Sequence, residues 1–263
     1  MGWDVCAVRY AQHTLRRSRI YHRYGTHSLP DASVELTFYF WVARRGNEVV
    51  VIDTGFRPDW FTTSGDDDPT WVVPPTEALA LVGVDPATVG TVVLSHLHFD
   101  HMGNVDLFPH ADIVMQSDEY AFWTGPDTTS PPVRSMTDPV ALSALERIDA
   151  EDRLQLVDGD LTLAPGLDLR RLPGHSPGQQ GVLIDDTVLL ASDAAHFYDE
   201  IEQQLLFGTF TDLPAMFATY RAMATWAADG ITVVPGHDPD VMTRFPPVDP
   251  SRPDLAVWLH RAH

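Results

Sequence analysis

Three histidines and an aspartate lie within six positions in the sequence SHLHFDH, which includes the end of the apolar run 90–95. A loop that leaves the end of a strand can direct such side chains into a cleft. Imidazole nitrogens and carboxylate oxygens are ligands that zinc takes in proteins. His96 and His98, which are two residues apart, can point the same way, and Asp100 and His101 can then face a second ion. The motif therefore predicts a metal site.

One such cluster does not complete a coordination shell, so further ligands must come from other parts of the chain. Three later apolar runs each end directly before or near a histidine or an aspartate, and proline and glycine frame two of these positions in a way that forces a turn. These residues are His175 after the run 167–172, Asp193 after 187–192, and His237 after 231–234. Chance rarely produces four strand ends that all present metal ligands.

The composition excludes several other kinds of chemistry. All 17 basic residues are arginines, so a lysine Schiff base and a Walker A phosphate loop are both ruled out. With 37 acidic residues the net charge is -20, which predicts poor nucleic-acid binding because such binding depends on neutralising phosphates. The single cysteine, Cys6, excludes an internal disulfide framework and a cysteine-rich metal site.

The length of 263 residues corresponds to one large domain or two small ones. No linker-like stretch divides the chain, which favours a single domain over residues 1–263. The sequence contains no apolar run of about 18 residues, so we expect no membrane span. No secretory signal is visible, and we therefore expect a cytoplasmic protein. Exposed aromatic residues would allow a homodimer.

The hydrophobic pattern predicts strands interleaved with helices, without strict β-α-β alternation. Strands are expected at residues 33–43, 48–53, 90–95, 112–116, 153–157, 161–163, 167–172, 181–185, 187–192 and 231–234. Helices are expected at 76–83 with Thr76 as cap, at 140–149, and at 213–228 with Asp212 as cap. The segments 57–75 and 125–139 are expected to be surface excursions, the second a candidate lid. This order favours an α+β fold of two sheets with helices outside.

The combined motif resembles that of the metallo-β-lactamase superfamily. It consists of His96-x-His98-x-Asp100-His101, then His175, Asp193 and His237, with Asp53-Thr54-Gly55 at an upstream strand end. The resemblance implies an αββα sandwich of two mixed β-sheets flanked by helices. It also implies two zinc ions, one held by His96, His98 and His175, the other by Asp100, His101 and His237, with Asp193 as the bridge. Manganese, cobalt or iron would fit the same ligands.

Within the superfamily, the chain is most similar to the N-acyl homoserine lactonase group, in its size and in the segments Val8-Arg9-Tyr10 and Ser192-Asp193-Ala194-Ala195. The group's mechanism implies a hydroxide, held between two ions, that attacks a carbonyl and opens a lactone or related cyclic ester. Its members carry a tyrosine three residues after the bridging aspartate, where this chain has His196. The leaving alkoxide needs a counter-charge or a proton, which the second ion, Asp100 or His196 could supply. Asp53 is expected to orient a ligand histidine through its other ring nitrogen.

The same ligands would serve other reactions. A thioester hydrolase of the glyoxalase II or polyketide thioesterase type is the main alternative, although few residues follow His237 to form the basic helical domain that glyoxalase II uses. A phosphodiesterase and a di-iron redox protein fit less well, given the acidity and the lack of a flavin domain. The expected partner is a small-molecule ester or lactone, with no nucleic acid and no membrane.

A group of arginines near the start of the chain allows two interpretations. Arg16, Arg17, Arg19 and Arg23 could meet an anionic substrate. A solvated or salt-bridged segment is the simpler interpretation, given the excess of acidic residues. The aromatics Trp60, Phe61 and Trp71 could line an acyl pocket or cover the core.

Overall fold

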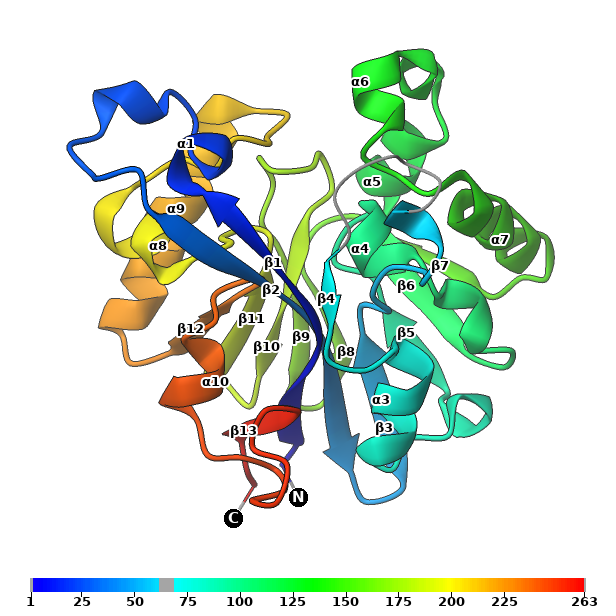
Figure 1. The fold of residues 1–263 in the computed structure, drawn as a ribbon. Coiled ribbons are helices and arrows are strands. Elements are labelled where there is room, and N and C mark those ends of the chain that lie inside the picture. Colours follow the sequence, from blue (N-terminus) through cyan, green and yellow to red (C-terminus); the bar gives the residue numbers. More distant parts are fainter. Residues whose placement is uncertain (1, 62–68, 263) are drawn as a thin grey trace.

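The computed structural model describes residues 2–61 and 69–262. Two β-sheets lie face to face at its centre, and helices cover the outer face of each sheet, so the layers follow the order α, β, β, α (Figure 1). Both sheets are mixed, since each contains parallel and antiparallel pairs. The αββα sandwich predicted from the sequence is confirmed.

The larger sheet has the strand order β13-β1-β2-β3-β5-β6-β7, and the short strand β4 pairs with β1. Its strands are β1 (Asp4–Arg16), β2 (Ser33–Arg45), β3 (Glu48–Ile52), β4 (Thr70–Trp71), β5 (Thr91–Val93), β6 (Asp112–Gln116), β7 (Leu154–Val157) and β13 (Ala256–His260). Strands β3, β5, β6 and β7 run parallel to one another. Their carboxyl ends therefore meet at one edge of the sheet.

The smaller sheet has the order β12-β11-β10-β9-β8. Its strands are β8 (Leu161–Ala164), β9 (Leu167–Arg171), β10 (Gln180–Ile184), β11 (Val188–Ser192) and β12 (Thr232–Pro235). Strands β11 and β12 are parallel, whereas the other neighbours are antiparallel.

Helices pack on the outer faces of both sheets (Figure 1). The α-helices are α1 (Arg17–Ile20), α3 (Pro75–Leu81), α4 (Phe99–Met102), α5 (Ser117–Trp123), α6 (Pro131–Arg134), α7 (Pro139–Ala150), α8 (Tyr198–Gln203), α9 (Leu213–Ala228) and α10 (Val241–Arg244). The 3-10 turns within the described residues are η1 (Tyr24–Thr26), η2 (Pro86–Thr88), η3 (Val105–Leu107) and η4 (Pro126–Thr129). Helices α3 and α7 share a buried apolar cluster with the larger sheet, and α9 shares one with the smaller sheet.

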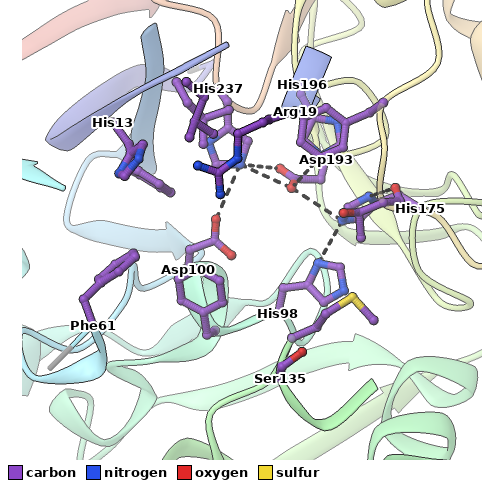
Figure 2. Close-up of a pocket in the computed structure, with 17 residues that line it drawn as sticks. His13, Arg19, Phe61, His98, Asp100, Ser135, His175, Asp193, His196 and His237 are labelled. Carbon is purple, nitrogen blue, oxygen red and sulfur yellow. Dashed lines mark hydrogen bonds and ion pairs between the residues drawn. The ribbon is translucent and has the colours of Figure 1, made fainter. Parts of the chain in front are cut away.

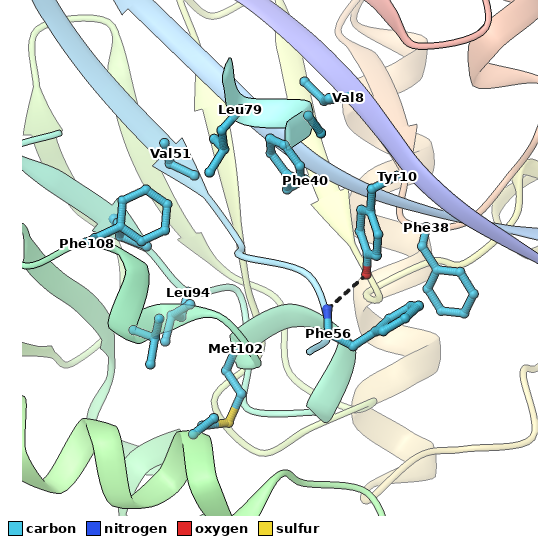
Figure 3. Packing of buried hydrophobic residues seen from close by; sticks show 14 of the residues in the cluster. Val8, Tyr10, Phe38, Phe40, Val51, Phe56, Leu79, Leu94, Met102 and Phe108 are labelled. Carbon is cyan, nitrogen blue, oxygen red and sulfur yellow. Dashed lines mark hydrogen bonds between the residues drawn. The ribbon is translucent and has the colours of Figure 1, made fainter. Parts of the chain in front are cut away.

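Strand β2 shows how one strand serves two layers. Because successive side chains of a strand point to opposite faces, a strand covered on both sides is apolar throughout. Phe38 and Phe40 point to the helix side, where they pack with Tyr10 (Figure 3). Tyr39 and Trp41 point the other way, into the cluster between the sheets. The run FYFW in the sequence therefore supplies both apolar layers.

The only cysteine lies in the helix-side cluster. Cys6 is on β1 and is 3% exposed. Burial raises the pKa of its thiol to about 12, because the charged thiolate would lose its hydration. The thiol is therefore protonated and shielded in the folded chain.

Most predicted elements are confirmed, and α9 spans Leu213–Ala228 as expected. The side chain of Asp212 caps it by accepting a hydrogen bond from Ala215 N at 3.0 Å. The prediction that Thr76 caps the helix expected at 76–83 is wrong. This helix, α3, begins at Pro75, whose fixed φ suits the first helical position, and Pro74 stands at its N-cap.

Other differences concern the ends and the excursions of the chain. Strands β1 and β13, which pair with each other in the larger sheet, were not predicted from the sequence. The excursion 125–139 is partly helical, since it contains η4 and α6. Residues 62–68 of the loop expected at 57–75 lie outside the described residues. Within the described ranges, none of the helices is both long and apolar enough to cross a membrane.

Candidate metal centre

The predicted ligands lie at strand ends that the fold brings together. His96 and His98 follow β5, while Asp100 and His101 lie on α4 directly after them. The remaining three are His175 after β9, Asp193 after β11 and His237 after β12. All seven side chains are buried. Residues from distant parts of the sequence thus meet at one site (Figure 2).

The seven side chains form two groups that share Asp193. The first group is His96, His98, His175 and Asp193, and the second group is Asp100, His101, Asp193 and His237. Within each group the potential ligand atoms lie within 4.8 Å of one another. One carboxylate oxygen of Asp193, Oδ2, lies 3.5 Å from His175 Nε2, whereas Oδ1 lies 3.0 Å from His237 Nε2. Asp193 therefore faces both groups at once.

Several of these atoms are buried without a hydrogen-bond partner. Among the described residues this holds for Nε2 of His96 and of His98, while His101 Nε2 and Asp193 Oδ1 lie 3.2 Å apart without forming a well-aligned hydrogen bond. A buried polar atom without a partner is costly, so such atoms are rare in folded proteins. Nitrogen and oxygen donors in this arrangement suit a divalent cation such as zinc. The residues present therefore fit the metal centre that the fold family implies.

The electrostatics of the first group favour neutral imidazoles. Burial lowers the pKa of His96 and of His175 well below the usual range, and neighbouring imidazoles act in the same direction. Burial likewise lowers the pKa of His98 to about 4. A neutral imidazole keeps a lone pair that can bind a metal ion.

The second group differs because carboxylates surround it. Burial disfavours the charged form of His101, but nearby carboxylates, chiefly Asp193 and Asp100, outweigh burial and raise its pKa. Burial disfavours the carboxylate of Asp193, but His237 and His101 outweigh it and lower the pKa of Asp193. The second group is therefore the more strongly charged of the two.

Oxygen atoms outside the two groups hold the far nitrogens of three histidines. Asp53 Oδ2 lies 2.7 Å from His101 Nδ1, Thr37 O lies 2.9 Å from His237 Nδ1, and Thr209 O lies 3.0 Å from His175 Nδ1. Such contacts fix the orientation of the ring and direct its Nε2 toward the site. Asp53 also accepts a hydrogen bond from Ser95 N at 2.7 Å, so it ties the end of β3 to the end of β5.

A glycine permits the close approach around Asp193. A Cβ atom at Gly236 would lie 2.5 Å from Asp193 Oδ1, which is shorter than any real contact of this kind. The Pro-Gly pair before His237 therefore does more than form a turn, because the missing side chain leaves room for the shared carboxylate.

Glu119 of α5 is a site residue that the sequence analysis missed. Its buried carboxylate accepts hydrogen bonds from Leu97 N at 2.8 Å, from Gly178 N at 2.8 Å and from Trp123 Nε1 at 2.7 Å. The hydroxyl of Ser176 donates to the same carboxylate at 2.6 Å. Glu119 thus fastens the loop of His96 and His98 to the loop that follows His175. Only tertiary structure reveals this role, since a glutamate in a helix carries no local signal.

His196 lies beside the shared aspartate. Its Nε2 is 3.1 Å from Asp193 Oδ2, and its Nδ1 is 3.4 Å from Glu200. The ring of Phe207 stacks on the imidazole with a centroid distance of 3.4 Å. Tyr220 donates a hydrogen bond from its hydroxyl to Glu200 Oε2 at 2.8 Å. Burial opposes the charge on His196, but Asp193 and Glu200 outweigh it and raise the pKa to about 9.

The two groups form the floor of a cavity of about 280 Å³. The floor is lined by His98, Asp100, His175, Asp193, His196 and His237. Its walls are mainly apolar and include Leu36, Phe38, Phe61, Phe99, Met136 and Phe207. Of the three aromatics singled out in the sequence, Phe61 lines this cavity, Trp60 stacks on Phe99, and Trp71 packs on Phe56.

Comparison with known proteins identifies the family. Residues 35–237 match the metallo-beta-lactamase superfamily. The chain belongs to this superfamily. Its sequence is 34% identical over 176 residues to the N-acyl homoserine lactonase AttM of Agrobacterium fabrum, a match that covers 64% of this chain and 65% of AttM. It is 28% identical over 171 residues to the N-acyl homoserine lactonase AiiA of Bacillus thuringiensis subsp. kurstaki, covering 61% of this chain and 60% of AiiA. The chain thus matches less than two thirds of the length of these curated relatives.

Solved structures share the fold of this superfamily member. A quorum-quenching N-acyl homoserine lactone lactonase superposes with a TM-score of 0.71 at 20% identity, over 91% of this chain and 94% of that one. The dizinc quorum-quenching lactonase AidC, in complex with N-hexanoyl-L-homoserine, superposes with a TM-score of 0.71 at 17% identity, over 99% of this chain and 95% of AidC. The sequence matches confirm the resemblance to lactonases expected from the motif, and the solved structures confirm the fold.

Proposed function

We propose that this superfamily member is a dinuclear-metal hydrolase that opens a lactone or related cyclic ester. The observation that carries the proposal is the pair of buried ligand groups that share Asp193 on the floor of an apolar-walled cavity. The similarity to N-acyl homoserine lactonases supports the same reaction class. A small cyclic ester fits such a cavity, because apolar walls suit its carbon skeleton and the polar floor suits its carbonyl.

The proposed ligands are the two groups defined above, and the proposed ions are zinc. Two divalent cations at such a site polarise a carbonyl and make water a nucleophile at neutral pH. Asp193 would contact both, while Asp53 would keep the His101 ring in place through Nδ1.

Two side chains on the cavity floor are proposed to accept and donate protons during the reaction. Ring opening converts the ring oxygen into an alcohol, so a proton must reach that oxygen. Asp100 lines the cavity and can take the proton of the attacking water at its carboxylate oxygen. His196 also lines it, with Nε2 directed at Asp193, and can donate a hydrogen bond or a proton to a substrate oxygen there.

The proposal is tested by a substrate panel on protein of known metal content. We expect lactones to be hydrolysed faster than acyl thioesters and phosphodiesters, and we expect a chelator to abolish the activity. Replacing His98 by alanine should lower kcat/KM by at least about 100-fold, since a lost ligand costs more than a lost outer contact. The exposed His110 gives the matched control, and H110A should stay near wild type. Faster turnover of thioesters than of any lactone would replace this proposal with thioester hydrolysis.

His196 gives a second test of the site. His196→Phe should lower kcat by about 100-fold while two metal ions per chain are retained, since the ring loses its donor but not its shape. His196→Tyr restores a hydroxyl donor and should recover part of the rate. Metal analysis of both variants measures the number of bound ions, and steady-state kinetics measures kcat. A phenylalanine variant as fast as the wild type would show that no donor is needed at this position.

The other predictions concern the chain as a whole. We propose a single domain over residues 1–263, supported by β1 and β13, which lie at opposite ends of the sequence and pair in one sheet. The proposed partner is a small-molecule substrate and not a nucleic acid, in keeping with the net charge of -20. The cytoplasmic location and the homodimer stay predictions of the sequence.

A further inference from the structure

One stretch of this acidic chain carries only positive charge. Residues 5–30 contain no aspartate or glutamate, although the whole chain has a net charge of -20. The same stretch contains five of the 17 arginines, namely Arg9, Arg16, Arg17, Arg19 and Arg23. A local concentration of positive charge attracts negatively charged ligands.

Arg19 is the arginine of this stretch that lines the cavity above the two ligand groups. Figure 2 shows its guanidinium directed into the cavity, on the side of His237 and Asp193. Other arginines of the stretch have partners elsewhere, since Arg9 contacts Asp254 and Arg16 donates to Asp31 O. Within the described ranges, the Arg19 side chain makes no hydrogen bond or ion pair.

The backbone that carries Arg19 is firmly anchored. The next residue, Ile20, is 1% exposed and packs in a buried cluster with Phe197. Gly208 N donates to Ile20 O at 2.6 Å, and His22 N donates to Leu206 O at 2.8 Å. These bonds tie α1 to the loop that carries Phe207, which forms a wall of the cavity. The backbone at Arg19 is thus fixed beside the cavity, and its exposed side chain reaches the cavity from there.

A guanidinium at the edge of an apolar cavity suits one kind of ligand group. Its planar fork of donors matches the two oxygens of a carboxylate, and because Arg19 is exposed, water screens part of such a charged contact. The carboxylates of the floor, Asp100 and Asp193, belong to the second ligand group and face its histidines. A carboxylate of the substrate itself would therefore be the natural partner of Arg19.

We propose that Arg19 forms a subsite for a carboxylate of the substrate, so that the preferred lactone bears a negatively charged arm. This inference rests on the proposed lactonase function, whose substrate class it narrows. It assigns the apolar walls to the arm's carbon chain and the ligand groups to the ring carbonyl. A neutral lactone of equal size would bind the floor and the walls but leave Arg19 without a partner.

The first experiment compares γ-butyrolactones that carry carboxylate-ended arms of one to five carbons with methyl-ended lactones of equal arm length. We expect the wild type to prefer the carboxylate at one or more lengths. Arg19→Gln should lower kcat/KM for that substrate about tenfold, as for a lost charge-assisted hydrogen bond, and change it less than twofold for the neutral one. Arg23→Gln removes the same charge from the same stretch, outside the cavity lining, and should change both less than twofold. A preference for the neutral lactones at every length, or equal effects of the two variants, would overturn the proposal.

The second experiment does not depend on catalysis. The fluorescent anion 8-anilinonaphthalene-1-sulfonate has an apolar body and one sulfonate, and its affinity for the metal-loaded protein can be titrated. We expect Arg19→Gln to weaken binding about tenfold and Arg23→Gln to leave it almost unchanged. If no lactone is hydrolysed but this difference is found, the lactonase proposal fails and the anion subsite stands. Equal affinity in the wild type and Arg19→Gln would refute the subsite.

Discussion

Replacing Asp193 by asparagine is expected to abolish tight binding of two metal ions and to lower kcat/KM about 1000-fold. Asp193 is the one residue that both ligand groups share, with Oδ1 3.0 Å from His237 Nε2 and Oδ2 3.5 Å from His175 Nε2. Asparagine keeps the shape but has one oxygen and no charge, so it cannot serve both groups. A loss of about 4 kcal/mol of transition-state stabilisation corresponds to that factor.

Metal analysis of the purified variant and steady-state kinetics on the best lactone measure this effect. Asp199→Asn is the matched control, because Asp199 lies nearby on α8 and belongs to neither group. It should retain two ions and near wild-type activity. Two tightly bound ions in Asp193→Asn would contradict the shared role of this carboxylate.

Replacing Glu119 by glutamine is expected to lower the free energy of unfolding by about 3 kcal/mol and to weaken metal binding. The contacts described for this carboxylate are all with donors: two backbone N–H groups, an indole N–H and a hydroxyl. A carboxylate only accepts, whereas the glutamine amide would direct its own N–H₂ at some of these donors. The loops of His98 and His175 would then lose their common anchor.

Urea unfolding of the metal-free protein measures the stability, and a competition titration with a chelator measures metal affinity. Because Glu119 holds the loops that carry His96, His98 and His175, the first group should lose more affinity than the second. Glu146→Gln on the exposed face of α7 is the control and should change stability by less than about 0.5 kcal/mol. A variant that is as stable as wild type and loses metal affinity equally at both groups would show that Glu119 does not fasten these loops.

The strands, and the positions of the proposed ligands beside them, could be predicted from the sequence because both depend on local patterns. Each proposed ligand stands where an apolar run stops, so the position of His175 or Asp193 could be predicted from a few neighbouring residues. The β2 strand was equally clear, since its FYFW run fits a strand covered on both faces. A known motif then joined these separate signals into one site.

The sequence did not reveal features that depend on contacts between distant residues. The donors that Glu119 meets lie before and after it in the chain, at Leu97 and Gly178. Strand β1 was missed because polar residues such as Gln12 and Arg16 interrupt its apolar pattern, and pairing along β2 stabilises it instead. Arg19 looked like one solvated cation among several, and only the fold directs it into the cavity.

The position of Cys6 affects how the protein responds to its redox surroundings. Its thiol is enclosed in β1 and has a pKa of about 12, so almost none of it is in the reactive thiolate form at neutral pH. Oxidants and alkylating agents therefore meet no accessible sulfur on the native protein, and an intermolecular disulfide cannot form until β1 separates from the helix-side core. The extent of cysteine labelling would then measure the fraction of molecules in which β1 has separated from the core.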